Sequence, residues 1–557
     1  MTPDLNDVPA LLAAARAWMG DDPDDQTRAE LEAVVAAVEA GGDSADLARA
    51  DLQDRFDGTL EFGTAGLRGA LGAGPNRMNR VVVIRAAAGL AAYLRDTGHA
   101  SGSVVIGYDA RHNSDVFARD TAEVMTGAGL TAYLLPRPLP TPLLAFAIRE
   151  LGCSAGVMVT ASHNPPQDNG YKVYLGDGSQ IVPPADTEIA TRIASVGAVA
   201  EVPRGGAGTV VGEEIVDRYL DTVADLAGEG PRDLSIVYTP LHGVGGTTVQ
   251  QVLEAAGFGE PATVEQQERP DPDFPTVAFP NPEEPGAMDL AMALAAERGA
   301  DLVVANDPDA DRCAVAVPDP HGWRMLRGDE VGALLAHALL RKGKPGAYAC
   351  SIVSSSLLGK MAAAAGRPYA ETLTGFKWIS KVPDLAYGYE EALGYCVDPE
   401  HVKDKDGISA LLLICELAAA AKAEGRSLTD ILDDIAVEHG LHATDQLSVR
   451  VTDLGEIAAA MARLRTSPPA ELGGFAVEAV DDLSLGSAAL PPTDGLRYRL
   501  AEGARVIVRP SGTEPKLKCY LEVVVPVAPE DGVEAARIAA VGRLDALRDG
   551  IKQAAGI

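Results

Sequence analysis

The chain has 557 residues, a formal net charge of −33, and a hydrophobic content of 47% of which little is aromatic. This length corresponds to roughly three to five domains of ordinary size. The negative charge argues against nucleic acid as a partner, because such binding depends on Lys and Arg at the phosphates. An anionic substrate would need a locally basic cleft in this acidic body.

No membrane or export signal is evident in the sequence. Residues 1–30 lack the basic start of a signal peptide, and the longest apolar stretch, residues 408–421, is too short to cross a bilayer. The six cysteines are far apart and form no C-x-x-C pair, as expected for thiols in a reducing compartment. We therefore expect a cytoplasmic protein that binds neither membranes nor nucleic acid.

Short apolar runs along most of the chain predict strands, each followed by a loop and an Ala/Leu-rich helix. Alternation of this kind is typical of parallel sheets covered by helices. One such helix is expected to begin near Asn113 and another near Glu213. The predicted strands cover residues 104–106, 131–135, 155–160, 234–238, 302–305 and 348–353.

From about His442 the pattern changes to strands and helices without regular alternation, which indicates an α+β domain. The Gly-rich residues 205–208 and the turn at 318–322 mark further boundaries. The sequence thus predicts an α/β protein with three related α/β domains, whose sheets are mixed but mostly parallel, and a smaller α+β C-terminal domain. The predicted domains are residues 1–205, 206–325, 326–440 and 441–557.

The first chemical motif is the segment 160–165, Thr-Ala-Ser-His-Asn-Pro, at the end of a predicted strand. Ser162 at such a corner is a candidate nucleophile. The adjacent His163 suggests a hydrolase, but a triad base comes from elsewhere in a fold and no G-x-S-x-G elbow is present. Lys172 could hold a phosphate, or move a proton if burial lowers its pKa. The alternative is an ordinary turn with an Asx cap.

The second motif is the segment 306–312, Asn-Asp-Pro-Asp-Ala-Asp-Arg, which follows the apolar run 302–305. Three carboxylates at alternate positions repel one another unless a cation neutralises them, and oxygen ligands suit Mg²⁺. A calcium EF-hand is excluded, because Arg312 and Pro318 stand where that motif needs Gly and Glu. The alternative is a solvated acidic loop. We expect a metal loop at the carboxyl end of a strand.

Two later segments carry groups that could bind a phosphorylated ligand. Glu390 and Glu391 lie in a Gly-flanked loop and suit recognition of sugar hydroxyls, although a solvated surface pair is the alternative. Residues 509–518 place an Arg, two hydroxyls and a Gly between two predicted strands. This combination favours a phosphate cradle over a merely basic hairpin.

Together these segments resemble the α-D-phosphohexomutase superfamily of phosphoglucomutases and phosphomannomutases. The resemblance extends from Phe62 to Tyr520, and its signatures occur in the family's order. They are an N-terminal active-site segment at 62–69, a phosphoserine loop at 160–165, a metal loop at 307–312, a sugar-recognition loop at 390–394 and a phosphate loop at 509–513.

The length and the runs 374–377 and 404–407 look most like the branch that holds phosphoglucomutase and phosphopentomutase. One position departs from the family pattern: Leu393 stands where many members have Ser in the recognition loop. This departure removes a hydroxyl contact and weakens the inference of a preferred sugar.

The resemblance also implies the roles of individual residues. Mg²⁺ would be held by Asp307, Asp309, Asp311 and a phosphoryl oxygen on Ser162. The catalytic residues would be Ser162, His163, Lys172 and Arg68; the substrate-binding residues Arg312, Thr374, Gly375, Lys377, Glu390, Glu391, His401 and Lys405; and the phosphate-binding residues Arg509, Ser511, Gly512 and Thr513.

The implied activity is a phosphosugar mutase that interconverts a sugar 1-phosphate and its 6-phosphate or 5-phosphate isomer. A phosphoserine enzyme and a bisphosphorylated sugar are the implied intermediates, with a sugar bisphosphate as primer. Phosphoglucomutase is the first expectation, and phosphomannomutase, phosphopentomutase or a hexose-1,6-bisphosphate synthase are the alternatives. The expected partner is a small sugar phosphate, and the expected state is a monomer or homodimer. A non-catalytic sugar-phosphate sensor and a metal phosphatase are further rivals.

Overall fold

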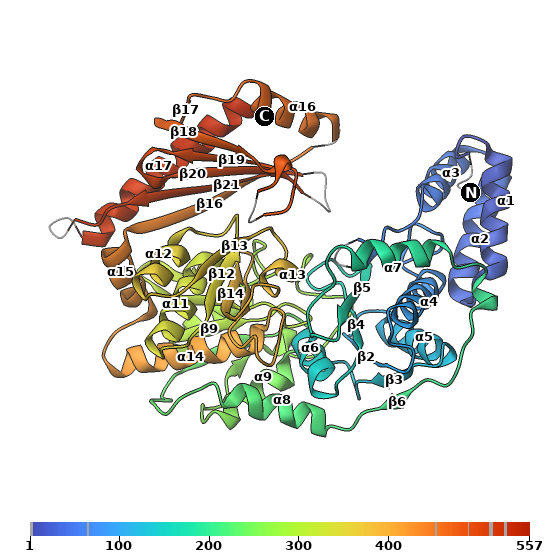
Figure 1. Cartoon of the computed structure of the whole chain (residues 1–557), viewed down its shortest axis with the longest axis horizontal. Coiled ribbons are helices and arrows are strands. Elements are labelled where there is room, and N and C mark those ends of the chain that lie inside the picture. Colours follow the sequence, from blue (N-terminus) through green and yellow to red (C-terminus); the bar gives the residue numbers. More distant parts are fainter. Residues whose placement is uncertain are drawn as a thin grey trace. The chain divides into compact units, whose positions relative to one another are not determined.

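The computed structural model describes residues 4–63, 66–451, 454–487, 490–511, 516–528 and 532–556. The chain forms two compact units (Figure 1). Unit 1 consists of Met1–Arg324 and Asp398–Leu412, and unit 2 of Met325–Val397 and Leu413–Ile557. Within the described ranges, no helix combines the length and the apolar character needed to traverse a bilayer.

Unit 1 begins with a helical segment that the strand–helix pattern did not predict. Arg55 pairs with Glu30 at 2.6 Å and also donates to the carbonyl oxygen of Ala73 at 3.1 Å. These contacts tie α3 to α2 and to the segment that follows the first strand of the first sheet. The helices are α1 (Val8–Asp21), α2 (Asp25–Ala40) and α3 (Asp43–Phe56).

The first sheet of unit 1 is mixed, in the order β1-β5-β4-β2-β3-β6. Strand β2 runs parallel to β3 and β4, whereas β5 is antiparallel to both β4 and β1. The central strands are apolar on both faces because helices cover both sides. The elements are β1 (Leu67–Ala70), α4 (Arg80–Asp96), β2 (Ser103–Tyr108), α5 (Ser114–Gly127), β3 (Thr131–Leu134), α6 (Thr141–Glu150), β4 (Ala155–Val159), β5 (Asp168–Leu175), α7 (Ala185–Ala194) and β6 (Thr209–Val210).

The second sheet of unit 1 has the order β11-β10-β9-β7-β8. Its strand β9 is fully buried, parallel to β7 and antiparallel to β10. The acidic segment 306–312 therefore leaves the carboxyl end of a parallel strand, as predicted. The elements are α8 (Glu214–Ala224), β7 (Ile236–Thr239), α9 (Gly246–Ala255), β8 (Ala262–Thr263), α10 (Asp289–Arg298), β9 (Leu302–Ala305), β10 (Ala314–Asp319) and β11 (Gly322–Met325).

Unit 2 contains a third sheet of the same kind, in the order β13-β12-β14-β15. Strand β12 is parallel to β13 and β14, and β15 is antiparallel to β14. The segment 398–412, which the sequence assigns to this domain, packs instead with unit 1. The elements are α11 (Gly328–Arg341), β12 (Ala347–Ser351), α12 (Leu357–Ala364), β13 (Tyr369–Thr372), α13 (Phe376–Ile379), β14 (Leu385–Glu390), β15 (Gly394–Cys396), α14 (Gly407–Ala423) and α15 (Leu428–His439).

The C-terminal sheet, also in unit 2, has the order β16-β21-β20-β19-β18-β17, and its neighbouring strands are antiparallel where the structure describes their pairing. Two helices pack with it, and their apolar side chains share one core with its strands. The elements are β16 (Leu441–Arg450), α16 (Leu454–Thr466), β17 (Glu471–Leu472), β18 (Phe475–Asp482), β19 (Leu496–Leu500), β20 (Arg505–Pro510), β21 (Lys516–Val525) and α17 (Gly532–Ala555).

The predicted fold class is confirmed by these sheets: mixed, mostly parallel α/β sheets come first and an antiparallel α+β domain comes last. All six cysteines are unpaired and buried, two in unit 1 and four in unit 2. The exact domain limits predicted from the sequence stay a proposal.

Candidate active site

Ser162 lies in unit 1 at the corner after β4, and its side chain is buried. Its backbone is left-handed, with φ of 52°, which is uncommon for a residue other than glycine. The amide of Ser162 donates to Oγ1 of Thr160 at 2.9 Å, which fixes the start of the corner. The Ser162 hydroxyl donates to Oδ2 of Asp307 at 2.8 Å, and Nδ1 of His163 lies 3.1 Å from Oγ of Ser162. The serine and the acidic loop, 145 residues apart in sequence, are thus in direct contact.

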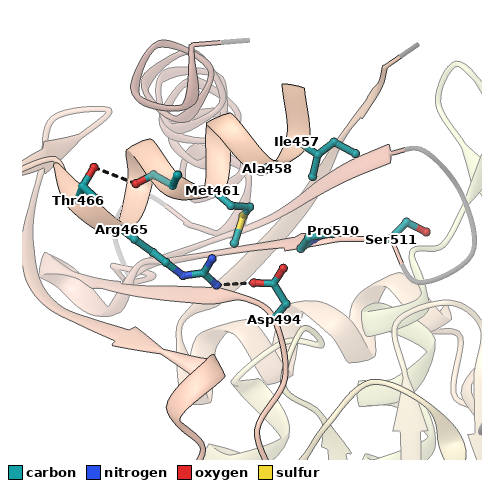
Figure 2. Close-up of a pocket in the computed structure, with 9 residues that line it drawn as sticks. Ile457, Ala458, Met461, Arg465, Thr466, Asp494, Pro510 and Ser511 are labelled. Atoms are coloured by element: carbon teal, nitrogen blue, oxygen red, sulfur yellow. Dashed lines mark hydrogen bonds and ion pairs between the residues drawn. The ribbon is translucent and has the colours of Figure 1, made fainter. Parts of the chain in front are cut away.

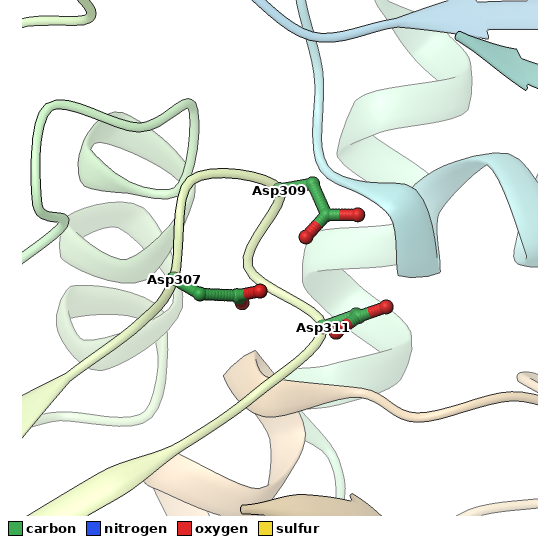
Figure 3. Close-up of side chains that lie close together, drawn as sticks. All are labelled: Asp307, Asp309 and Asp311. Atoms are coloured by element: carbon green, nitrogen blue, oxygen red, sulfur yellow. The ribbon is translucent and has the colours of Figure 1, made fainter. Parts of the chain in front are cut away.

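Asp307, Asp309 and Asp311 project from the single loop that follows β9 (Figure 3). One oxygen of each carboxylate lies within 4.8 Å of the others, and all three residues are buried. The loop closes on itself, because the amide of Ala310 donates to the carbonyl of Asp307 at 2.9 Å. Asn306 adds a second closure by donating to the carbonyl of Arg312 at 2.6 Å.

Two lysines from distant segments approach this cluster. Nζ of Lys172, on β5, lies 2.7 Å from Asp309 and 2.9 Å from Asp311. Nζ of Lys405, from the segment 398–412, lies 3.0 Å from Asp311. The two lysines therefore lie at Asp309 and Asp311, whereas Asp307 contacts the serine hydroxyl.

The three carboxylates consequently differ in their proton affinity. Burial, together with the charges of Asp309 and Asp311, raises the pKa of Asp307 well above its ordinary value. Burial also opposes ionisation of Asp311, but Lys172 and Lys405 outweigh it and hold the pKa of that carboxyl below its usual range. A third negative charge, on Asp307, is therefore disfavoured in this cluster unless a further cation lies beside it.

The cluster has the donors that a divalent cation requires. Among the described residues, Oδ1 of Asp309 and Oδ1 of Asp311 are buried and have no hydrogen-bond partner. A buried carboxylate oxygen without a partner is costly unless a cation satisfies it. Carboxylate oxygens are the ligands that hard cations prefer. The predicted acidic triplet therefore forms a site able to hold a metal ion.

The two candidate proton carriers behave differently. Burial lowers the pKa of His163 well below its ordinary value, so its ring is neutral near pH 7. Burial opposes the charge of Lys172 as well, but Asp309 and Asp311 outweigh it and raise the pKa of this lysine. From the sequence, Lys172 could move a proton if burial lowered its pKa. The pKa is raised instead, so this condition is not met.

Arginines surround the Ser162 corner. Arg68, on β1, donates to Oδ1 of Asn164 at 3.1 Å. Arg312 lies 3.9 Å from Oδ2 of Asp307 and 3.7 Å from Glu283. These positions place the two predicted arginines beside the serine and the acidic loop.

The segment 398–412 brings two predicted residues into unit 1, but only one of them reaches the carboxylates. Lys405 does so, as described. Nδ1 of His401 instead lies 2.6 Å from Oδ2 of Asp398, and half of its side chain is exposed. Gly407 comes two residues after Lys405. A Cβ atom at this position would lie 2.1 Å from the carbonyl oxygen of Arg312, so the position requires glycine.

The predicted sugar-recognition residues lie in unit 2. Oε2 of Glu391 accepts hydrogen bonds from the hydroxyls of Ser351 and Ser354, both at 3.1 Å. Glu390 accepts from the amide of Gly375 at 2.7 Å, which links the recognition loop to the 374–377 turn. In that turn Thr374 is partly exposed, and Lys377 packs against Trp378 with Nζ 5.6 Å from the ring centre.

The predicted phosphate-binding residues that the structure describes are Arg509 and Ser511; Gly512 and Thr513 lie outside the described residues. Arg509 is the last residue but one of β20 and lies against Tyr520 of the neighbouring strand. Ser511 lines a cavity of about 470 Å³ between α16 and the end of β20 (Figure 2). One wall of the cavity carries the ion pair of Arg465 and Asp494.

Several residues of the site had no sequence signal that we could use. Thr141, the first residue of α6, donates from its hydroxyl to Oδ2 of Asp309 at 2.7 Å. Arg111 binds the backbone of the Ser162 loop, although Gly107-Tyr108-Asp109 did mark a strand end nearby. Ser351 and Ser354 support Glu391. All of them act across long sequence separations.

Comparison with known proteins assigns the chain to one family along most of its length. The models named "Phosphoglucomutase/phosphomannomutase, alpha/beta/alpha domain" I, II and III match residues 59–199, 217–322 and 327–438. The model of the family's C-terminal domain matches residues 447–540. Helices α1–α3 precede the first match.

Individual relatives agree with this assignment. A "Probable phosphomannomutase" of Haemophilus influenzae is 51% identical over 80% of this chain and 93% of the relative. A "Probable phosphoribomutase" of Schizosaccharomyces pombe is 37% identical over 92% of this chain and 94% of the relative. The solved structure of parafusin, a phosphoglucomutase from Paramecium, has the same fold, with a TM-score of 0.68 at 20% identity over 90% of this chain and 96% of that chain.

The α/β fold, the contact of a buried serine with an acidic loop, and these relatives define an enzyme of the intramolecular phosphotransferase class, an isomerase. The chain belongs to the phosphoglucomutase/phosphomannomutase family.

Proposed function

We propose that the protein interconverts a sugar 1-phosphate and its 6-phosphate or 5-phosphate isomer, with Ser162 as the residue that carries the phosphoryl group. The observation that carries this proposal is the 2.8 Å contact between the Ser162 hydroxyl and Asp307 in a buried cluster of three carboxylates. A hydroxyl in this position can exchange its proton for a phosphoryl group that faces a metal site.

The metal in this proposal is Mg²⁺, held by Asp307, Asp309, Asp311 and an oxygen on Ser162. When bound, it offsets the charge that develops as a phosphoryl group transfers. Arg68 and Arg312 lie on the same corner and would bind the remaining phosphoryl oxygens. Arginine suits this task because its planar fork of N–H donors matches phosphate geometry.

In this scheme His163 is the residue that moves the proton. Its Nδ1 lies 3.1 Å from the Ser162 oxygen, and its lowered pKa leaves a neutral ring that can accept a proton. Lys172 remains protonated between two aspartates and is better suited to donate a hydrogen bond or a proton than to accept one. Lys405 has a similar position at Asp311, and His401 lies earlier in the same segment.

Substrate recognition is assigned to unit 2. The two serine hydroxyls orient the Glu391 carboxylate, whose remaining acceptor capacity suits ring hydroxyls. Arg509 and Ser511 would bind the phosphate that is not transferred, together with Gly512 and Thr513. The substrate must turn over between the two half-reactions, so a sugar bisphosphate is the proposed intermediate and primer. Thr374, Gly375, Lys377 and Glu390 would complete the sugar site.

The preferred sugar is the finer part of the proposal. Glucose phosphate was the first expectation from the sequence, but the names of the relatives support mannose phosphate or ribose phosphate at least as well. The hydroxyls that separate these substrates each contribute on the order of 1 kcal/mol, and Leu393 has no hydroxyl at the position where the family resemblance leads us to expect a serine. A sugar-1,6-bisphosphate synthase remains the alternative reaction.

The test is a panel of glucose, mannose, ribose and deoxyribose 1-phosphates, each assayed with Mg²⁺ and a trace of the matching bisphosphate. A mutase regenerates the bisphosphate and releases no free phosphate. Net bisphosphate accumulation would indicate the synthase, and release of inorganic phosphate would indicate a phosphatase. Ser162→Ala should abolish turnover of every sugar while the protein still folds; turnover near that of the wild type would exclude Ser162 as the phosphoryl carrier.

A further inference from the structure

The loop that carries Ser162 has few hydrogen-bond donors of its own. Pro165 and Pro166 have no N–H group, so the carbonyls of Asn164 and Pro165 belong to tertiary amides. Ser162 itself is left-handed, a conformation that persists only where the surroundings hold it. Within the loop, the amide of Asp168 donates to the carbonyl of Pro165 at 3.1 Å. The buried carbonyls of Ser162 and Asn164 need donors from elsewhere in the fold.

One side chain supplies these donors. The guanidinium of Arg111, in the turn between β2 and α5, donates four hydrogen bonds to main-chain carbonyl oxygens of this loop, and the residue is only 4% exposed. Two of the bonds end on Ser162 and Asn164, at 2.6 and 2.5 Å. The other two end on Pro165 and Asp168, at 2.8 and 3.1 Å. The carbonyls of Asn164 and Pro165, whose own peptides have no N–H group, thus both accept a hydrogen bond from this arginine.

Arg111 is itself held in place from two sides. Its Nε lies 3.4 Å from Oδ2 of Asp109, and Asp109 also accepts the amide of Arg111 at 3.0 Å and the hydroxyl of Ser114 at 2.7 Å. Its guanidinium carbon lies 4.9 Å from the ring centre of Phe274. A guanidinium stacked on a ring and bound at its base has little freedom left.

The consequence reaches the reacting groups. Arg111 fixes the carbonyl of Ser162, so the planar peptide that follows directs the N–H of His163 to the opposite side. It also fixes Asn164, whose side chain accepts from Arg68 and donates to Asp168 at 2.8 Å. The orientations of the serine, the histidine and one phosphate-binding arginine therefore all depend on one buried guanidinium.

We propose that Arg111 is a positioning residue for phosphoryl transfer: it holds the 162–168 loop by four carbonyl contacts so that Oγ of Ser162 faces the acidic loop. Arg111 contacts no substrate in this scheme. The inference rests on the proposed phosphoserine mechanism.

The decisive variant is Arg111→Lys, which retains the charge but has one nitrogen where the arginine has a fork. We expect kcat to fall about 100-fold, the loss typical of a reacting group displaced by about 1 Å, while KM for the sugar phosphate stays within about threefold of the wild-type value. The phosphoserine signal in ³¹P NMR should shift or broaden, because the loop is no longer held in one conformation.

Arg55→Lys is the matched control. Arg55 is also largely buried, pairs with carboxylates and donates to a carbonyl, yet it lies outside the site. This variant should lose stability and keep the wild-type kcat per folded molecule. A folded Arg111→Lys protein with wild-type kcat and an unchanged ³¹P spectrum would overturn the proposal.

A second variant covers the case in which Arg111→Lys does not fold. Phe274→Leu removes the ring beneath the guanidinium and leaves the four carbonyl contacts, so we expect kcat to fall several-fold with KM unchanged; an unchanged kcat would contradict the proposal. Failure of the underlying mechanism is recognised separately, because wild-type protein incubated with sugar bisphosphate would then carry no phosphoryl group on Ser162.

Discussion

Each unit of the protein contains a buried cluster of charged side chains, and the two clusters are built differently. In unit 1, Asp307, Asp309 and Asp311 share Lys172 and Lys405, and two carboxylate oxygens are left without hydrogen-bond partners. In unit 2, Glu522 accepts hydrogen bonds from Arg505 and from the hydroxyl of Ser355, and it lies 3.1 Å from His442.

The two clusters also shift pKa values in opposite ways. Burial and neighbouring carboxylates raise the pKa of Asp307. Burial opposes ionisation of Glu522 too, but Arg505 outweighs it and holds the pKa of Glu522 far below its usual range. The first cluster therefore leaves two carboxylate oxygens for a cation, whereas the charge of Glu522 is offset by Arg505 of the protein itself. Incomplete neutralisation is characteristic of functional sites, and complete neutralisation of structural ones.

The largest expected effect is that of Asp307→Asn. The substitution removes a buried charge that repels two others, so we expect kcat to fall by about 10³-fold or more while the midpoint of thermal unfolding without divalent metal equals or exceeds that of the wild type. Calorimetry with and without Mg²⁺ checks this. The wild type should gain stability with Mg²⁺ and the variant should gain little; a marked destabilisation of the metal-free variant would mean that the cluster is structural after all.

The second effect concerns the cluster of unit 2. Glu522→Ala leaves the Arg505 guanidinium buried without its main partner, so the free energy of unfolding should fall by about 3–5 kcal/mol, as measured by urea denaturation. Glu534→Ala serves as the control, because the Glu534 carboxylate is largely exposed in its pair with Arg537 and its loss should cost less than about 1 kcal/mol. Equal losses for the two variants would contradict the comparison.

The third prediction uses a buried carboxylate of unit 1 that has no cation comparable to Arg505. Asp406 accepts from the amides of Ile408 and Ser409 and from the hydroxyl of Tyr219, and burial raises its pKa to about 6 from 3.8. The folded state therefore binds a proton more tightly than the unfolded state, and stability is lost as the pH rises between about 3.8 and 6.

Asp406→Asn removes this pH dependence. The variant should be more stable than the wild type by up to about 3 kcal/mol at pH 8, the free energy of about two pKa units, and by about 1 kcal/mol at pH 4.5. Urea denaturation at the two pH values measures the difference. A gain that is the same at both would show that ionisation of Asp406 is not its source.

The smallest effect is that of Ser354→Ala, which removes one of the two hydroxyls that orient Glu391. We expect KM for the preferred sugar phosphate to rise about fivefold, equivalent to about 1 kcal/mol, with a smaller change in kcat. The hydroxyl of Ser356 lies near His442, so Ser356→Ala is the matched control and should leave KM unchanged. An unchanged KM in Ser354→Ala would mean that the remaining contact of Ser351 is sufficient.

The sequence was informative where chemistry and local structure coincide in one short segment. A buried apolar run followed by Asp307, Asp309 and Asp311 predicts both a strand and what its carboxyl end can bind. Ser162 is a candidate for the same reason, because it follows the predicted strand 155–160. The resemblance to the family gave the order of the remaining loops, and the comparisons confirm the family and the fold class.

Contacts between distant segments could not be predicted in this way. The partners of Arg111 are backbone carbonyls. Every residue has such a carbonyl, so these contacts leave no pattern in the sequence. The charge state of Lys172 depends on two aspartates that arrive from another sheet. Helices α1–α3 were also missed, because three amphipathic helices before the first strand do not interrupt an alternating α/β pattern.

The burial of all six cysteines provides an intrinsic reporter of unfolding. Burial raises the pKa of Cys153 and Cys519, the latter to about 12, so the thiolate that an alkylating reagent attacks is scarce while each residue stays folded. Cys153 and Cys313 report on unit 1, and the other four report on unit 2. Peptide mapping after timed alkylation would therefore follow the opening of each unit separately in the unmodified chain, without an introduced label.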